Sequence, residues 1–142
     1  MKLDLKEWIK RVTNTINDAN KEKDRATGTL TLYNCTGTIS HNQLEFIVSK
    51  SGAIYVQGRI NINSFARTGT NPGVTIALPL IVATPKYTRS YMIGFRAQNP
   101  REALGLNMTA NSRNVSLTTY ESFQNAQNGT LTFIVSGRIF VE

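Results

Sequence analysis

The spacing of apolar residues changes once along the chain, close to residue 26, and this change limits the possible folds. Before it, four apolar residues recur at intervals of four, three and four, which places them on one stripe of an α-helix. These residues are Leu5, Ile9, Val12 and Ile16. After it, apolar and polar residues alternate with the period of two that is typical of half-buried β-strands. We therefore divide the chain into a helical stem and linker over residues 1–25 and a β-domain over residues 26–142.

The alternation predicts many short strands in the second region. It is clearest over residues 29–33, 54–62 and 131–141, and further strands are predicted at 44–49, 74–78, 89–97, 103–109 and 114–119. Turn-forming pairs separate them, such as Ser51-Gly52 and Asn128-Gly129. No helical pattern intervenes between the strands. We therefore expect a mainly β chain, a jelly-roll-like antiparallel β-sandwich preceded by a short N-terminal α-helix.

The polar composition agrees with a β-fold. Charged residues make up only 18% of the chain, whereas Asn, Thr and Ser together supply 40 of its 142 residues. Threonine suits pleated strands, and asparagine and serine suit turns.

The net charge of +7 does not by itself predict a nucleic-acid partner, because the Lys and Arg residues of the β-domain stand singly rather than in a basic cluster. The first residues lack the apolar core of a secretion signal, and no segment approaches the length of a membrane span. We expect synthesis in a cytoplasm, without membrane insertion. Cys35 is the only cysteine, so an intrachain disulfide is excluded, and we expect a buried thiol.

The helix has two possible roles. A helix of about two heptads is marginal alone in water, so its stripe requires an apolar partner. It either folds back onto its own sheet or forms a short coiled-coil stem. In the second case Ile9 and Ile16 occupy a positions, and branched residues at both a and d favour three or more strands. The candidate oligomerisation residues are Leu5, Trp8, Ile9, Val12 and Ile16. The polar residues 18–25 are interpreted as a frayed helix end or a linker.

One short pattern occurs twice in the β-domain. Val56-Gln57-Gly58-Arg59-Ile60 matches Val135-Ser136-Gly137-Arg138-Ile139. In each copy a glycine stands where the alternation calls for a core side chain, which indicates a bend, a bulge or a close backbone approach. We interpret the match either as coincidence or as two strands in equivalent places of two sheets, with both arginines pointing outward.

The residues needed for catalysis are scarce. His41 is the only histidine, and Ser40-His41-Asn42 is a predicted turn. Only four glutamates lie beyond the helical region, and of these Glu102 and Glu121 are the candidates for a carboxylate pair. Neither a zinc cluster, a calcium loop nor a phosphate-binding glycine loop is present in the sequence. We therefore predict a protein that is not an enzyme, with no catalytic, metal-binding or cofactor-binding residues and no cofactor.

Residues 44–142 resemble the C-terminal β-sandwich domains of phage tail-fibre and baseplate receptor-binding proteins. The resemblance rests on the apolar–Gly–apolar strand around Gly58, the following Leu78-Pro79, the Pro85-Lys86-Tyr87 turn before another strand, and the closing strand around Gly137. It implies a homotrimer in the virion, made in a bacterial host cytoplasm, with the helix as stem or as the attachment to another virion protein.

The resemblance also implies binding of a saccharide on the host cell surface. Aromatic and polar side chains are the natural candidates for such a ligand. They are Tyr87, Arg89 and Tyr91, which alternate along one predicted strand, and Tyr120, Asn125 and Gln127 in a polar loop. The alternatives are a structural adaptor, head fibre or capsid decoration protein without glycan binding, and a polysaccharide hydrolase that uses Glu102 and Glu121.

Overall fold

The computed structural model describes residues 4–42, 44–98, 101–119, 123 and 129–142, with the backbone alone at 17–20, 41 and 42. One helix, α1 (Leu5–Asn20), is followed by ten strands. These are β1 (Glu22–Thr27), β2 (Thr29–Tyr33), β3 (Cys35–Asn42), β4 (Glu45–Ser49), β5 (Ile54–Arg67), β6 (Gly73–Ala77), β7 (Arg89–Arg96), β8 (Ala103–Met108), β9 (Asn114–Thr118) and β10 (Leu131–Ile139).

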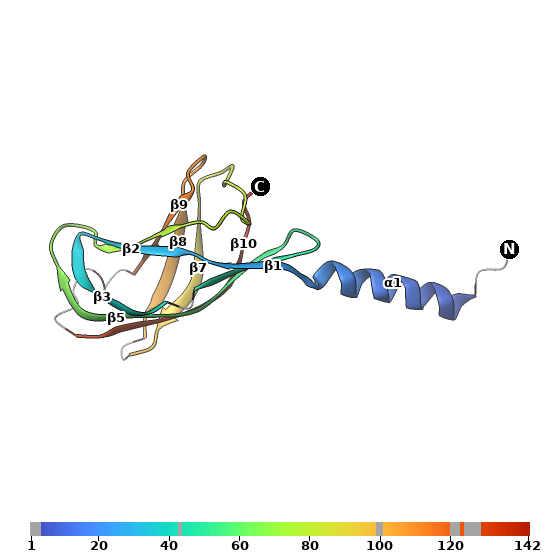
Figure 1. The fold of residues 1–142 in the computed structure, drawn as a ribbon, viewed down its shortest axis with the longest axis horizontal. Coiled ribbons are helices and arrows are strands. Elements are labelled where there is room, and N and C mark those ends of the chain that lie inside the picture. Colours follow the sequence, from blue (N-terminus) through green and yellow to red (C-terminus); the bar gives the residue numbers. More distant parts are fainter. Residues whose placement is uncertain (1–3, 43, 99–100, 120–122, 124–128) are drawn as a thin grey trace.

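Helix α1 begins at an N-terminal cap and extends away from the strands. The Oδ1 atom of Asp4 accepts a hydrogen bond of 3.0 Å from the backbone N–H of Lys6, which satisfies one of the free donors of the first turn. Glu7 adds negative charge in the same turn, where the helix dipole favours it. The helix continues the long axis of the molecule and stands clear of the β-domain (Figure 1).

The described strands form a single antiparallel sheet that folds around one core (Figure 1). Its order is β1-β4-β5-β10-β7-β8-β9-β6-β2, with β3 paired to β5 beside this path. The predicted mainly β antiparallel fold with a short N-terminal helix is confirmed.

Aromatic side chains fill the centre of the core. Phe65 and Phe123 meet edge to face with ring centroids 5.9 Å apart, and Phe123 stacks on Phe133 at 5.1 Å. All three are fully buried. Inward residues of β5 and β10 complete the wall. In β5 alternate positions point inward from Ile54 to Ile62, and the phase shifts at Ser64, whose φ is 54°, so that Phe65 also points inward.

Strand β1 is the first difference from the sequence prediction. Residues 22–25, interpreted above as a helix end or linker, belong to this strand, and the division at residues 25 and 26 falls inside it. β1 pairs with β4 at five register positions, from Glu22↔Ser49 to Thr27↔Glu45. Its side chains are almost all exposed, so it carries no apolar alternation. Backbone pairing with β4, rather than side-chain burial, makes this segment a strand.

Strand β3 is the second difference. The segment around His41 was predicted as a turn, but it lies in β3, where His41 is in register with Asn61 of β5. The chain turns instead at Asn34, between β2 and β3. The φ of Asn34 is 54°, in the left-handed region that asparagine tolerates. β5 also continues to Arg67, five residues beyond the predicted end. β3 and the end of β5 pair with each other. Because this backbone pairing makes both segments strands, neither strand is evident from its own sequence.

The repeated glycine pattern has a different explanation from the one predicted. The two copies do not occupy equivalent places in two sheets, because β5 and β10 are adjacent and antiparallel, with Gly58 opposite Val135 and Val56 opposite Gly137. Each glycine thus faces the other copy's valine. A Cβ at Gly137 would lie 3.0 Å from Cγ1 of Ile93, so the glycine makes room for this side chain rather than for a close backbone approach. The two arginines, Arg59 and Arg138, are exposed as predicted.

Candidate functional site

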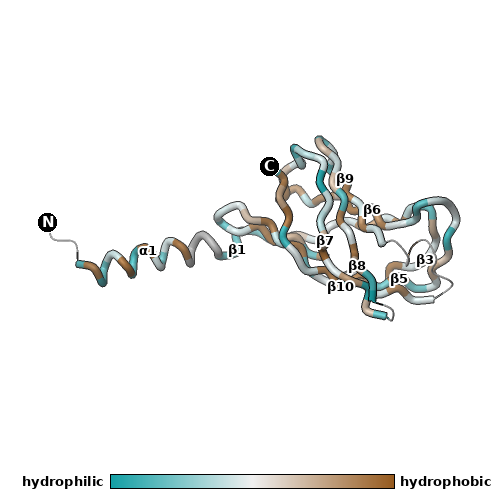
Figure 2. Tube along the Cα trace, turned by 180° about the vertical axis from the view of Figure 1, so that it is seen from behind, coloured by the Kyte–Doolittle hydropathy of each residue, from teal (hydrophilic) through white to brown (hydrophobic). Residues whose placement is uncertain are grey.

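The apolar stripe of α1 is exposed along its whole length. Its five candidate oligomerisation residues retain between 38% and 67% of their accessible surface, with Leu5 the most exposed and Val12 the least. Figure 2 shows hydrophobic segments recurring along the free-standing helix. The structure therefore excludes the alternative in which α1 folds back onto its own sheet.

The charges of α1 lie away from this stripe. In the heptad assignment the positions flanking the stripe hold Lys6, Trp8, Thr13 and Thr15. Glu7, Lys10 and Arg11 instead occupy the outer f, b and c positions, respectively. A seam between parallel copies of this helix would bring together apolar and neutral side chains, with Lys6 as the single charge at its edge.

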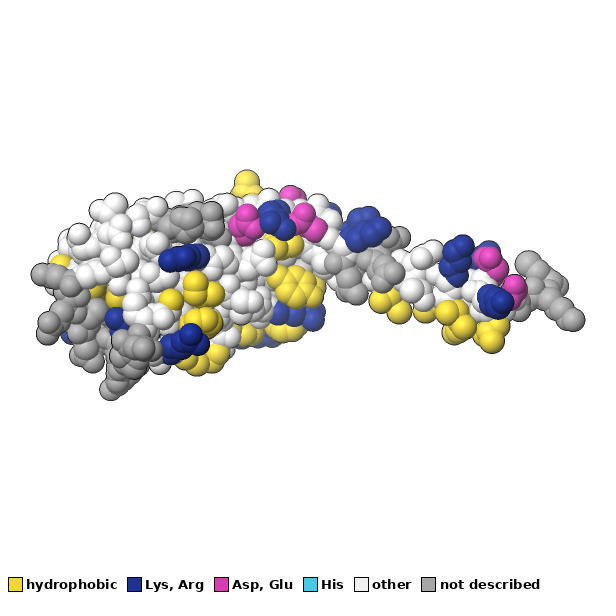
Figure 3. Space-filling view, turned by 90° about the horizontal axis from the view of Figure 1, so that it is seen from below, with side chains coloured by type: hydrophobic (Ala, Val, Ile, Leu, Met, Phe, Trp, Pro, Cys, Tyr) yellow, Lys and Arg dark blue, Asp and Glu magenta, His cyan; other side chains and the backbone are white. Residues whose placement is uncertain are grey.

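Further exposed apolar side chains gather on the outer face of the sheet. We define the outer-face patch as Tyr55 of β5, Met92 and Phe95 of β7, and Arg138 and Phe140 at the end of β10. Its four apolar members retain between 38% and 74% of their surface, with Met92 the most exposed. Figure 3 shows hydrophobic side chains beside Lys or Arg side chains on the β-domain.

Arginine side chains lie over the rings of this patch. Tyr55 and Arg138 face each other in register across β5 and β10, and the Arg138 guanidinium carbon lies 6.0 Å from the Tyr55 ring centroid and 4.7 Å from that of Phe140. Arg101 covers Phe95 at 5.4 Å. Within the described residues Arg138 forms no ion pair. In the described part of the chain its guanidinium lies against these two rings, so its N–H donors remain available to a partner.

Three of the predicted ligand-binding residues lie together. Tyr87 is 58% exposed, and the guanidinium carbon of Arg89 lies 5.2 Å from its ring centroid. Tyr91 is half-buried, and its hydroxyl donates to the carbonyl of Phe140 and accepts from the Phe140 N–H, both at 3.2 Å. Tyr91 therefore fixes the end of β10 rather than offering a free hydroxyl. Tyr87 and Arg89 form the exposed part of the group.

Sequence reasoning missed Phe140 as part of this group. Arg89 Nη1 also donates to the Phe140 carbonyl at 3.5 Å, and the Tyr91 and Phe140 rings lie 6.4 Å apart. The outward direction of Phe140 follows from its place between the inward Ile139 and Val141, but its contacts do not. The other three candidates, Tyr120, Asn125 and Gln127, lie outside the described residues, as does Glu121.

A groove of about 460 Å³ lies beside the patch, between the β4–β5 turn and the last residues of the chain. Its walls include Ser51, Ile81, Arg138, Phe140 and Glu142. It combines apolar walls with a few polar groups, as small-ligand sites do. Its open shape suits a surface-bound chain better than an enclosed small molecule.

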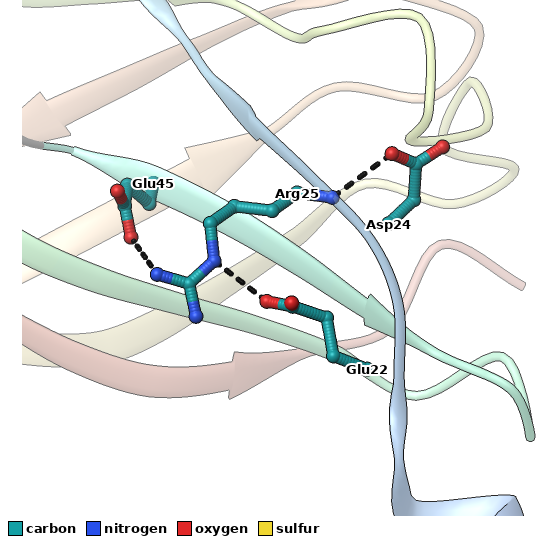
Figure 4. Close-up of polar contacts among 4 residues, drawn as sticks. All are labelled: Glu22, Asp24, Arg25 and Glu45. Carbon is teal, nitrogen blue, oxygen red and sulfur yellow. Dashed lines mark hydrogen bonds and ion pairs between the residues drawn. The ribbon is translucent and has the colours of Figure 1, made fainter.

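An ionic cluster fixes β1 to the edge of the sheet. Arg25 Nε lies 2.6 Å from Glu22 Oε1, and its Nη1 lies 2.8 Å from Glu45 Oε2 on β4 (Figure 4). The hydrogen bond to Glu22, together with the charges of both carboxylates, raises the pKa of Arg25. The pair with Glu45 ties β1 to β4 close to the end of the helix.

The interior thiol and a neighbouring phenol both favour their neutral forms. Burial raises the pKa of Cys35, against the opposing effect of backbone hydrogen bonds from Gly73 and Tyr33. Burial likewise raises the pKa of Tyr33. Each group is therefore stabilised in its protonated state.

No group of three His, Cys, Asp or Glu residues suited to a metal ion occurs in the part of the chain that the structure describes. None of the described helical residues forms a segment long and apolar enough to cross a membrane.

Comparison with protein families, curated proteins and solved structures finds no match to this chain. The resemblance to phage receptor-binding domains therefore stays a prediction.

Proposed function

We propose that this chain is a virion appendage of the phage receptor-binding type, in which α1 holds three copies together and the sandwich binds a saccharide on the host cell surface. The observation that carries the proposal is the uncovered stripe of α1. A free-standing helix with an exposed apolar stripe is unfavourable in water unless something covers it.

The stripe itself favours identical copies as its cover. Burying one Leu, Ile or Val side chain contributes roughly 1.5–3 kcal/mol, so covering the stripe supplies a substantial driving force. The β-branched residues Ile9, Val12 and Ile16 at both a and d positions favour three strands over two. Of the flanking positions only Lys6 is charged, so repulsion between copies is confined to that position.

Tyr87 and Arg89 support the saccharide part of the proposal, and Arg89 contacts Phe140, which lines the groove. An exposed tyrosine ring offers a flat apolar surface for a sugar face, and a guanidinium offers several N–H donors to hydroxyl or acidic groups. Three copies would present three such sites, and their joint binding would multiply a weak affinity.

The oligomeric state tests the stem. We expect light scattering of the full chain to give three times 15.8 kDa, and the Ile9→Asp/Ile16→Asp variant to give the monomer mass of 15.8 kDa. Asn14→Asp/Asn17→Asp adds the same two charges away from the stripe and serves as the matched control, which we expect to remain trimeric. A monomeric wild-type chain would contradict the proposal.

A structural adaptor or decoration protein without glycan binding is the second candidate. It is favoured by the internal hydrogen bonds that Tyr91 and Arg89 make with Phe140, which leave fewer groups for a ligand. Screening the trimer against host-surface glycans separates the two. In the receptor-binding case, Tyr87→Ala removes glycan binding and leaves the trimer mass unchanged, whereas an adaptor shows no glycan binding in either form.

A further inference from the structure

None of the described residues buries the outer-face patch, although it holds four of the six exposed large hydrophobic residues described in the β-domain. The six are Tyr55, Leu80, Tyr87, Met92, Phe95 and Phe140. Tyrosine, phenylalanine, methionine and arginine are the residue types enriched in protein–protein interfaces. The patch thus has the composition of a contact surface.

The connection between helix and sheet fixes the direction in which the patch faces. Lys21 is the single residue between α1 and β1, and its carbonyl accepts a 2.9 Å hydrogen bond from Lys50 N in the β4–β5 turn. β1 then pairs with β4, and Arg25 ties β1 to Glu45. The helix is therefore joined firmly to the sheet that carries the patch.

Hydrophobic side chains of the helix and of the sandwich are visible together in one view of the molecule (Figure 3). In Figure 3 the hydrophobic side chains of the helix run along its lower edge, and those of the sandwich gather on the lower half of the visible face. When parallel helices associate, their stripes face a common axis. Sandwich side chains that lie on the side of the stripe then face that axis too, towards the neighbouring copies.

A stem of two heptads is too short to hold the copies together by itself. A helix this short is marginally stable, and stable protein interfaces bury more surface than one short helix presents. A second contact through the sandwich supplies the missing area.

We propose that the outer-face patch binds a second copy of this chain, as the sandwich half of the interface that α1 begins. The inference rests on the trimer proposed above. Arg138, stacked on Tyr55 and Phe140 and without an ion pair among the described residues, contributes N–H donors to the neighbouring copy.

Methionine oxidation tests the contact directly, with the monomeric Ile9→Asp/Ile16→Asp variant as reference. Met92 is 74% exposed in the isolated chain and Met108 only 1%, so Met108 reports any unfolding. We expect hydrogen peroxide to oxidise Met92 at least about tenfold more slowly in the wild-type trimer than in the monomeric variant, since a buried interface side chain is shielded from solvent. Met108 should react slowly in both.

Self-association of a patch variant supplies the second measurement. Met92→Lys/Phe95→Ser should dissociate at a protein concentration about tenfold higher than the wild type or more, as loss of interface side chains does. Leu80→Ser, at a 94% exposed position outside the patch, should dissociate like the wild type. Thermal melting of each variant checks that its sandwich remains folded.

The outcomes separate the two proposals. A wild-type trimer whose Met92 reacts as fast as in the monomeric variant overturns the patch contact and leaves the stem standing. A wild-type monomer overturns both. A Met92→Lys/Phe95→Ser variant that stays fully trimeric but no longer binds host cells assigns the patch to the receptor, and so also overturns the contact between copies.

Discussion

Gly94 is the residue on which the packing of two central strands depends most directly. It lies in β7 at a bulge, where the register with β8 shifts between Met92 and Gly94. A Cβ at this position would overlap the carbonyl oxygen of Ile134 in β10. The overlap is with backbone, so no side chain can rotate to relieve it. Only glycine permits β7 and β10 to approach this closely.

We expect Gly94→Ala to lower the free energy of unfolding by about 2 kcal/mol or more, because the two backbones must separate. Gly105→Ala in β8 is the matched control, since its Cβ would have no neighbour closer than 3.7 Å. That variant should change the stability by less than about 1 kcal/mol. Urea denaturation of both variants measures the difference. Equal losses of unfolding free energy would show that the close approach of β7 and β10 does not require glycine at position 94.

The neutral thiol and phenol predict a loss of stability at alkaline pH. Burial raises the pKa of Cys35 and of Tyr33 in the folded state, so folding favours the protonated forms. Their contribution is complete below the unfolded-state pKa, about 8.5 for cysteine and about 10 for tyrosine, and is lost as pH rises through the folded-state pKa. The urea midpoint should therefore fall as pH rises above about 8.5, where the thiol titrates, and fall further above about pH 10, where the phenol titrates. Cys35→Ala should show a shallower fall; an unchanged slope would refute the role of the thiol.

At the scale of elements, β1 is the strand whose importance the sequence conceals. It forms one edge of the sheet and covers β4 through five register pairs. Without it, β4 would present an unpaired edge, which is a site for aggregation. The strand therefore contributes through backbone pairing and the Arg25 cluster rather than through a buried face.

Two truncations test this assignment. A chain starting at Lys21 lacks α1 but keeps β1, and we expect it to remain folded, monomeric and soluble. A chain starting at Gly28 also lacks β1, and we expect it to melt at a lower temperature and to aggregate through the β4 edge. Thermal melting and light scattering compare them. If both chains melt alike and stay soluble, β1 is dispensable.

At the scale of the whole molecule, we expect assembly to depend on α1 and folding of the β-domain to be independent of it. Its stripe makes no contribution to the core, so substitutions there should change the number of copies without weakening the sandwich. A receptor-binding function would then depend on the helix only through the number of linked sites.

We therefore expect Ile9→Asp/Ile16→Asp to keep the wild-type affinity for a soluble monovalent glycan and to lose about 10²-fold or more in binding to host cells, where several sites engage together. Calorimetry with the glycan and a cell-binding titration give the two values. The Asn14→Asp/Asn17→Asp control should match the wild type in both. Equal cell binding by all three proteins would argue against avidity.

The sequence predicts those parts of the fold whose pattern is local. The stripe of α1 and the strands with one buried face, such as β5 and β10, show their periods directly. Each period arises because one face of the element is apolar and the other is polar. Arg89 and Tyr91 alternate along β7 in the same way. Tyr91 and Phe140 are 49 residues apart, and the contact between them depends on a long-range pairing that no local period records.

The sequence by itself determined that a short amphipathic helix precedes an antiparallel β-domain, since hydrophobic burial imposes those two periods. Only the tertiary structure decided that residues 22–27 and 35–42 are strands, that the two glycine patterns pair with each other, and that the helix stands free of its own sheet. These features arise from backbone pairing and from the direction in which one element leaves another. Backbone hydrogen bonds are the same for every side chain, so the amino-acid pattern carries little trace of them.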